Sequence, residues 1–142
     1  MKELEYPFDA AYIIKKRKSL KKALLADGTS RIRKKIAVFG GSTTSDIVKT
    51  LELFLLDAGI EPEFYESEYA QYFQDAMFPD ETLLSFKPDI VFIHTTNRNV
   101  TDWPEMTDTT EQIDEKLHTE INRFTAMWKS IAEKFHCPIN DG

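Results

Sequence analysis

The residues that could do chemistry gather in one short loop, Gly40–Asp46, which reads Gly-Gly-Ser-Thr-Thr-Ser-Asp. An all-apolar run precedes this loop and an amphipathic one follows it, so we expect the loop to join a buried strand to a helix. The first N–H groups of a helix lack partners within it and carry the positive end of its dipole. An anion, or an oxyanion that develops during acyl transfer, is therefore favoured at this position.

Ser42 is the candidate nucleophile of this loop. A serine hydroxyl attacks an acyl carbon efficiently only when a general base takes its proton and N–H donors stabilise the oxyanion. Gly41 could supply such a donor, because glycine lets the backbone approach a ligand closely, and Thr43 is a further candidate for ligand binding. The alternative is that Ser42 or Thr43 only caps the helix or shapes the turn.

A second loop with polar donors, Thr95–Asn99, follows the clearest strand of the sequence. In open parallel sheets, ligands bind outside the carboxyl ends of the strands, so we expect this loop beside the first. It offers Asn97 as an amide donor and Arg98 as a fork for a carboxylate or phosphate, with His94 at the strand end. The simpler alternatives are a hydrogen-bonded structural histidine, an Asx-turn at Asn97 and a solvated arginine.

Two common phosphate-binding motifs are excluded. No Gly-Lys-[Ser/Thr] follows the glycines, so the loop is not a Walker A motif. Gly40 and Gly41 are adjacent, and no third glycine follows in register, so it is not the dinucleotide motif either. A generic phosphate-binding turn stays open as an alternative.

The placement of Ser42 after the first strand and Asn97 after the third resembles the SGNH-hydrolase fold. In that family, a histidine from an Asp-x-x-His element near the C-terminus activates the serine. Here Glu115-x-x-His118 has comparable spacing, but it lies in the middle of a long amphipathic helix, next to Leu117. The general base is thus missing from the chain, and without it Ser42 is expected to stay a weak nucleophile.

Alternating strand and helix patterns position these loops. They predict a three-layer α/β/α fold with a small parallel sheet, SGNH-like or flavodoxin-like, preceded by a basic N-terminal helix. We expect a basic helical extension at 1–35 and an SGNH-like α/β domain at 36–142. Strands are expected at Ile36–Phe39, Glu63–Tyr65, Asp89–His94 and from Cys137 to Ile139. Helices are expected from the Asp9 cap to Ala26, from the Ser42–Asp46 cluster to Gly59, near Glu81–Phe86, and over Ile113–Phe135.

The last of these helices is amphipathic. Its apolar residues recur at helical spacing and so share one stripe. The stripe consists of Ile113, Leu117, Ile121, Phe124, Trp128, Ile131 and Phe135.

Composition limits the class of protein. The chain has 142 residues, 42% hydrophobic and 30% charged, which suits one folded domain with its own core. No apolar run approaches the roughly 20 residues of a membrane helix, and a secretory signal is absent, so we expect a cytoplasmic protein that does not bind membranes. Cys137 is the sole cysteine, which excludes an internal disulfide and a cysteine-based metal cluster.

Charge is distributed unevenly along the chain. Residues 1–35 carry eleven Lys and Arg against four Asp and Glu, whereas the remainder carries seven against twenty. The basic part is either a solvated helix face beside an acidic body or a docking surface for an acidic protein. Nucleic acid is disfavoured, because the basic stretch has no interleaved aromatic residues and no binding signature.

Four segments together resemble the N-terminal region of FkbH-like proteins, subfamily IIIC of the haloacid-dehalogenase superfamily. They are Ile36–Thr44, Leu53–Glu66, Tyr69–Tyr72 and Pro88–His94, and the resemblance spans about residues 1–139 in order. Such proteins join an SGNH-like domain to a phosphatase-type domain. The resemblance implies transfer of a glyceryl unit from a phosphorylated three-carbon donor to an acyl carrier protein, in polyketide or polysaccharide biosynthesis.

The resemblance carries over only in part. The phosphatase chemistry needs an Asp-x-Asp loop and Mg²⁺, and the spacing of Asp108-Thr109-Thr110 does not provide that loop. We therefore expect no cofactor in this chain, and Mg²⁺ only in a phosphatase-type domain in cis. Where many relatives have glycines after the second strand, this chain has Glu66-Ser67-Glu68, whose carboxylates would oppose a developing oxyanion.

We therefore expect an accessory N-terminal domain of an FkbH-like phosphatase or glyceryltransferase, part of a longer multidomain protein. It would bind an acyl carrier protein, or a phosphopantetheine-linked acyl group, with the basic 15–35 segment as a docking face. Two other functions stay open. One is an SGNH-type serine esterase or acyltransferase that uses Ser42, and the other is a flavodoxin-like module that binds phosphate or nucleotide at Gly40–Asp46.

Overall fold

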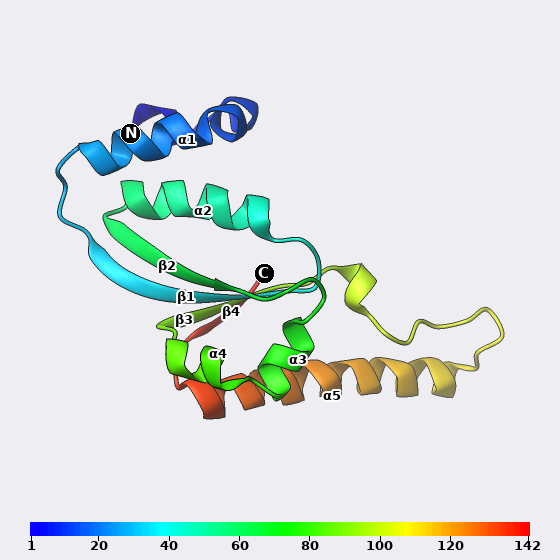
Figure 1. Ribbon diagram of the computed structural model, residues 1–142. Helices are drawn as coiled ribbons and strands as arrows, with labels where there is room; N and C mark the ends of the chain where they lie inside the picture. The colour runs from blue at the N-terminus through cyan, green and yellow to red at the C-terminus, as the bar shows by residue number, and fades with distance from the viewer.

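A computed structural model describes residues 1–142 and contains one four-stranded parallel sheet with helices on both faces (Figure 1). The strands are β1 (Ile32–Gly40), β2 (Ile60–Glu66), β3 (Ile90–His94) and β4 (Ile139–Asp141), in the order β2-β1-β3-β4. The helices are α1 (Ala10–Ala26), α2 (Ser45–Asp57), α3 (Tyr72–Met77), α4 (Glu81–Phe86) and α5 (Thr110–Phe135), with short 3-10 helices η1 (Lys2–Leu4) and η2 (Asn97–Asn99). The predicted three-layer α/β/α fold is confirmed.

The two central strands bring the two predicted loops to one edge of the sheet. β1 lies between β2 and β3, and its residues from Ile36 to Gly40 are all buried, as an apolar strand covered on both faces should be. The parallel register pairs Gly40 with His94, so β1 and β3 end at the same level. β2 is an edge strand, where Pro62 can be accommodated although it has no N–H to donate.

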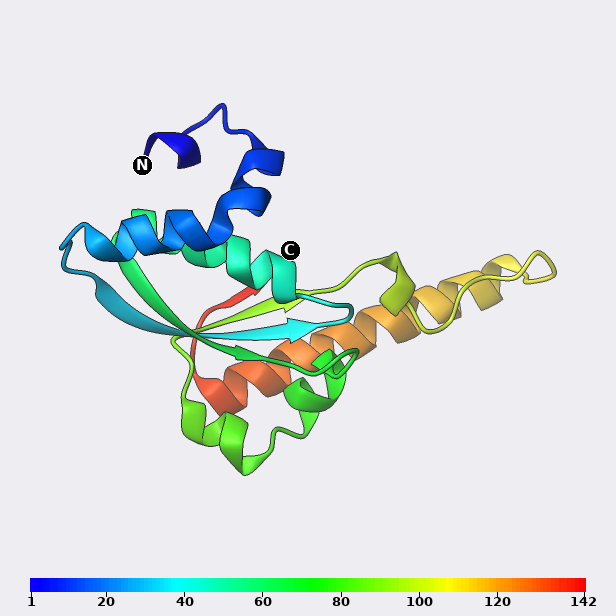
Figure 2. The same ribbon diagram turned by 45° about the horizontal axis from the view of Figure 1, so that its top comes forward.

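The basic helix α1 packs on the outside of α2, which in turn packs on the sheet (Figure 2). Asp9 caps α1 as predicted, accepting a hydrogen bond from the Tyr12 N–H at 3.0 Å. The two helices meet in one buried apolar cluster that also includes η1. Its members are Leu4, Ile13, Leu20, Leu24, Leu53 and Leu56.

Arg31 ties this helical layer to the start of β1. Its guanidinium donates to the carbonyl of Leu24 at 2.7 Å and to that of Leu56 at 2.8 Å, so it joins the ends of α1 and α2. The same guanidinium pairs with Asp27 at 2.9 Å. Arg31 therefore has a structural role within the basic segment, and only 6% of its side chain is exposed. β1 begins at Ile32, so the predicted boundary at residues 35 and 36 falls inside this strand.

The opposite face of the sheet is covered by α3, α4 and the carboxyl half of α5. The core there includes Phe39, Val91 and Ile93 from the strands, against Met127 and Ile131 from α5. The predicted apolar stripe of α5 only partly joins this core. Ile131 is buried, but Ile113, Leu117, Ile121 and Trp128 are 38%, 55%, 51% and 41% exposed.

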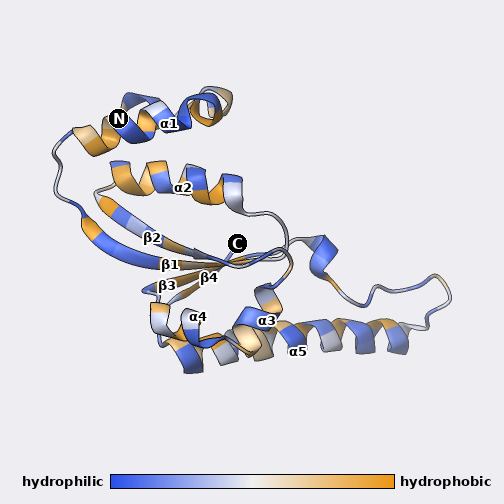
Figure 3. Ribbon diagram, viewed as in Figure 1, coloured by the Kyte–Doolittle hydropathy of each residue, from blue (hydrophilic) through white to orange (hydrophobic).

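The amino half of α5 extends beyond the sheet together with the connection that precedes it (Figure 2). That connection, residues 95–109, is mostly hydrophilic, whereas apolar and polar residues alternate along α5 (Figure 3). None of the helices combines the length and the apolar content needed to cross a bilayer.

Candidate functional site

The Gly40–Asp46 loop and the Thr95–Asn99 loop meet at the carboxyl ends of β1 and β3. The Gly41 N–H donates to the His94 carbonyl at 2.8 Å, which continues the sheet ladder by one residue. The backbone donor that was predicted for an oxyanion is therefore engaged within the sheet. The two loops do lie side by side, as the strand order requires.

Asn99 clamps the two loops together. Its side-chain N–H donates to the Gly41 carbonyl at 3.0 Å, and its side-chain oxygen accepts from the Thr96 N–H at 2.8 Å. A Cβ at Gly41 would overlap the Asn99 carboxamide, so a glycine is required there by close approach. Sequence reasoning missed Asn99, and the only signal for it was the second glycine of the pair.

The side chains predicted for this site take no part in the clamp. Asn97 and Arg98 lie in η2 with exposed side chains that make no hydrogen bond. Ser42 is half-buried, and its hydroxyl also has no hydrogen-bond partner. His94 is half-buried, and its ring stacks on Phe92 with 6.3 Å between centroids. The roles assigned to these residues stay predictions.

No histidine is paired with Ser42. The His118 ring lies on α5, where its Nδ1 is 2.8 Å from the Asp114 carbonyl oxygen. His136 ends α5 in the left-handed conformation, with φ of 52°. The structure thus gives the serine no partner that could take its proton in the present arrangement.

Acidic side chains of the chain itself occupy the start of α2. Thr44 is buried and donates from its hydroxyl to a Glu66 oxygen at 2.7 Å. Asp46, in the first turn, accepts from the Arg17 guanidinium at 2.8 Å. Carboxylates near a helix N-terminus interact favourably with its dipole. The charge that would attract a phosphate is therefore already partly balanced by Glu66 and Asp46.

The loop that follows β2 is also held by hydrogen bonds within the chain. The Ser67 N–H donates to the Val38 carbonyl at 2.9 Å, and its hydroxyl donates to Asp75 at 2.7 Å. The Tyr65 hydroxyl also donates to Asp75, at 3.4 Å. Burial, together with the Asp75 charge, raises the pKa of Tyr65 to about 12. In the loops that follow β1, β2 and β3, polar groups are thus hydrogen-bonded to other parts of the chain.

An arginine of α5 forms hydrogen bonds with residues at these loops. Arg123 donates to the Asn99 carbonyl at 2.6 Å and to the Tyr72 hydroxyl at 2.8 Å. It also pairs with the buried Glu120 at 2.9 Å, and Glu120 accepts from the N–H and hydroxyl of Thr101. The position of Asn99 is thereby fixed from both its side chain and its backbone.

Glu120 gives this network a pH dependence. Burial raises the pKa of its carboxyl, but hydrogen bonds from Thr101 and Arg123 outweigh burial, so the pKa lies below the ordinary 4.5. A lowered pKa contributes stability that is complete above the unfolded value and is lost as the pH falls through the folded value. We expect Glu120→Gln to be less stable than the wild type at pH 7, with a smaller loss of stability upon acidification. Urea unfolding at several pH values, with the exposed Glu133→Gln as control, tests this; parallel wild-type and Glu120→Gln curves would contradict it.

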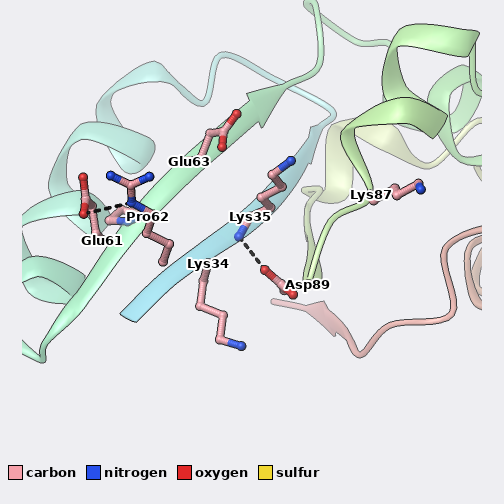
Figure 4. Close-up of a pocket in the computed structure, with 8 residues that line it drawn as sticks. Lys34, Lys35, Glu61, Pro62, Glu63, Lys87 and Asp89 are labelled. Carbon is pink, nitrogen blue, oxygen red and sulfur yellow. Dashed lines mark hydrogen bonds and ion pairs between the residues drawn. The ribbon is translucent and has the colours of Figure 1, made fainter. Parts of the chain in front are cut away.

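Two hollows in the surface lie away from the strand-end loops. One, about 640 Å³, is at the amino ends of β1 and β2 and is lined only by polar residues and a proline (Figure 4). There Asp89 accepts from the Lys35 N–H at 2.7 Å, and Arg33 pairs with Glu61 at 3.5 Å. This hollow is thus a solvated patch of mixed charges.

The second hollow is an apolar groove of about 480 Å³ on the α2 face of the sheet. Ile36, Ile90 and Phe92 of the strands contribute to its lining. Ile47, Leu51 and Leu55 of α2 also line it, at a spacing of four residues along one ridge. A sheet surface beside a helix ridge is the surface on which a further amphipathic helix packs in an α/β fold.

No protein-family model and no curated protein matches the sequence. Among solved structures, the fold is similar to the N-terminal part of the protein BF1531 from Bacteroides fragilis, described as containing a phosphatase domain and complexed with Mg. The TM-score is 0.67 and the sequence identity 18%. The match covers 88% of this chain and 32% of the other, so this chain spans about a third of that structure's length. The likeness establishes the fold.

Proposed function

We propose that this chain is an accessory α/β domain that works with a phosphatase-type domain and docks an acyl carrier protein, as in FkbH-like enzymes of polyketide or polysaccharide biosynthesis. The similar structure from Bacteroides fragilis is described as containing a phosphatase domain, which supports this context. The proposed role is to hold a carrier near its partner enzyme, and the phosphatase chemistry belongs to the partner domain.

One contact carries the docking proposal. The Arg17–Asp46 pair, at 2.8 Å, joins the middle of α1 to the start of α2. Lys15, Lys18 and Lys22 are exposed on the same helix, and we propose that they form the docking face. Carrier proteins are typically acidic, so this row of lysines suits them. A carrier docked there would have its phosphopantetheine arm close to the strand-end loops.

Polar groups of the strand-end loops are already hydrogen-bonded within the chain, which supports an accessory role. The Gly41 N–H and the Asn99 carboxamide are engaged with each other's loops, and Glu66 adds a carboxylate beside them. A catalytic oxyanion site needs free donors preorganised toward the developing charge. The apolar groove beside Leu51 supports packing of the phosphatase-type domain, because one of its amphipathic helices would complete that layer.

Charge reversal on α1 tests the docking. In Lys18→Glu with Lys22→Glu, we expect affinity for a purified, phosphopantetheine-bearing acyl carrier protein to fall at least about tenfold, a change of about 1.4 kcal/mol. Isothermal titration at low and high salt measures this, and wild-type binding should weaken as salt rises. Lys21 is left in place because it pairs with Glu52 at 2.7 Å.

Lys34→Glu with Lys87→Glu is the matched control, because both lysines are exposed and lie at the amino ends of the strands, away from α1 and the Gly40–Asp46 loop. This control should bind the carrier nearly as well as the wild type. Equal losses in both variants, or no binding by the wild type, would contradict docking on α1. Hydrolysis of a p-nitrophenyl ester that disappears in Ser42→Ala would contradict the accessory role and support the esterase alternative.

A further inference from the structure

We propose that the exposed stripe on α5 is a self-association surface, where a second copy of this chain packs its α5 in the antiparallel direction. The stripe is defined here as Ile113, Leu117, Ile121, Phe124 and Trp128. The proposal is independent of the carrier-docking function.

The amino part of the stripe, from Ile113 to Ile121, is an exposed apolar surface, whereas Phe124 at its other end packs against the core. Leu117 and Ile121 are 55% and 51% exposed, and Trp128 is 41% exposed. From Leu117 to Trp128 the spacings are four, three and four residues, which is the pattern of a helix–helix seam. Contiguous exposed apolar surface of this kind marks interaction sites. The stripe also continues past the sheet along the amino half of the helix, where α5 extends from the body (Figure 2).

The core of the monomer uses an adjacent side of the same helix, which overlaps the predicted stripe at Ile131. Met127, Ser130 and Ile131 are buried, and Ser130 donates to the Ala76 carbonyl at 2.8 Å. Helical geometry places the stripe roughly 90° away from the direction of these residues, on average. Trp128, at the carboxyl end of the stripe, donates to Asp141 of β4 at 2.7 Å. This end of the stripe therefore lies beside the edge strand of the sheet.

Charge selects the antiparallel direction. Glu111, Asp114 and Glu115 give the amino half of α5 an acidic character, and its one lysine, Lys116, is paired with Asp108 at 2.8 Å. The carboxyl half carries exposed Lys129 and Lys134 and a single exposed acid, Glu133. Antiparallel packing sets acidic amino halves against the carboxyl halves with their lysines, whereas parallel packing sets the acids against each other. Antiparallel packing around Ile121 and Phe124 also pairs Leu117 of one copy with Trp128 of the other.

Exposed apolar side chains of the preceding loop lie beside the same half of α5. Trp103 is 56% exposed, and its carbonyl accepts from Lys116 at 3.1 Å, which holds the loop against the helix. Met106 is fully exposed. A partner helix on the stripe would bring its own body next to this loop and add to the area buried.

Sedimentation equilibrium over a range of protein concentrations tests the proposal. We expect a concentration-dependent dimer for the wild type and a monomer for Leu117→Glu with Ile121→Glu. Both substituted residues are exposed, so circular dichroism should show an unchanged fold. The matched control is Ile14→Glu with Leu25→Glu on α1, where the side chains are 55% and 52% exposed. This control should dimerise as the wild type does.

A charge swap tests the direction. Lys129→Glu should weaken the dimer about tenfold, and adding Asp114→Lys should restore it, because each acid–base contact is rebuilt across the antiparallel interface. A monomeric wild type, or a dimer that survives Leu117→Glu with Ile121→Glu, would overturn the proposal. Failure of the swap to restore the dimer would overturn the antiparallel arrangement.

Discussion

Replacing Arg123 by alanine is expected to lower the free energy of unfolding by about 2–4 kcal/mol, the largest effect of any single substitution considered for this chain. The change leaves Glu120, only 8% exposed, without its cation, and removes donors from the Tyr72 hydroxyl and the Asn99 carbonyl. Breaking a buried pair by removing one partner is costly because the remaining charge stays buried. The guanidinium carbon of Arg123 also lies over the Phe124 ring, 4.8 Å from its centroid.

Urea unfolding followed by circular dichroism measures this loss. Arg123→Lys keeps the charge but loses the forked geometry, so we expect it to recover only part of the stability. Arg123→Met with Glu120→Gln removes both charges and should be markedly more stable than Arg123→Ala. If Arg123→Ala unfolds at the wild-type urea concentration, the network does not support the loops as described.

Introducing a methyl group at Gly41 is expected to have the second-largest effect. Gly41→Ala places a Cβ in the space of the Asn99 carboxamide, which is held by the Thr96 N–H and the Gly41 carbonyl. The side chain must leave and lose these hydrogen bonds, or the loops must separate. We expect a loss of about 1–3 kcal/mol in the free energy of unfolding.

The partner substitution makes this prediction specific. In an Asn99→Ala background, the space beside Gly41 is open, so Gly41→Ala should cost much less there. The coupling energy between the two positions should reach about 1 kcal/mol or more, the size expected for residues in direct contact. Equal costs in both backgrounds would show that the two loops do not touch through Asn99.

Much of the fold could be predicted from the sequence because its local signals agree. The apolar run before Gly40, the Asp9 cap and the alternation of strands and helices all favour the same parallel sheet, and the structure has it. The extent of β1 was underestimated. Its first residues, Ile32–Lys35, look like a charged linker, but they pair with β2 from Ile60 onward. Pairing between strands that are distant in sequence does not produce a recognisable local sequence pattern.

The candidate site could be predicted only in outline. The sequence places Ser42 and the Thr95–Asn99 loop at the same sheet edge, because parallel strands end together. It did not identify Asn99 as the residue that contacts Gly41, since the turn of η2 decides which asparagine faces the other loop. It also missed Arg123, which lies 24 residues beyond Asn99 and meets it only through the packing of α5.

The amphipathic pattern of α5 shows another limit of sequence reasoning. An apolar stripe at helical spacing indicates that a helix packs against something, but not what that partner is. Here Met127 and Ile131 face the sheet, whereas Leu117 and Ile121 face outward. Glu120, which interrupts the apolar pattern, is more buried than either of those two residues because Arg123 and Thr101 satisfy it.

The central functional claim is that α1 docks an acidic carrier next to the strand-end loops. The most direct measurement is an amide NMR titration of this chain with a phosphopantetheine-bearing acyl carrier protein. We predict that shifts concentrate on Lys15–Lys22 and on the neighbouring Gly40–Asp46 loop, and that they shrink as salt is added. Shifts confined to the far side of the sheet, around α3 and α4, or no shifts at a molar excess of carrier, would contradict the claim.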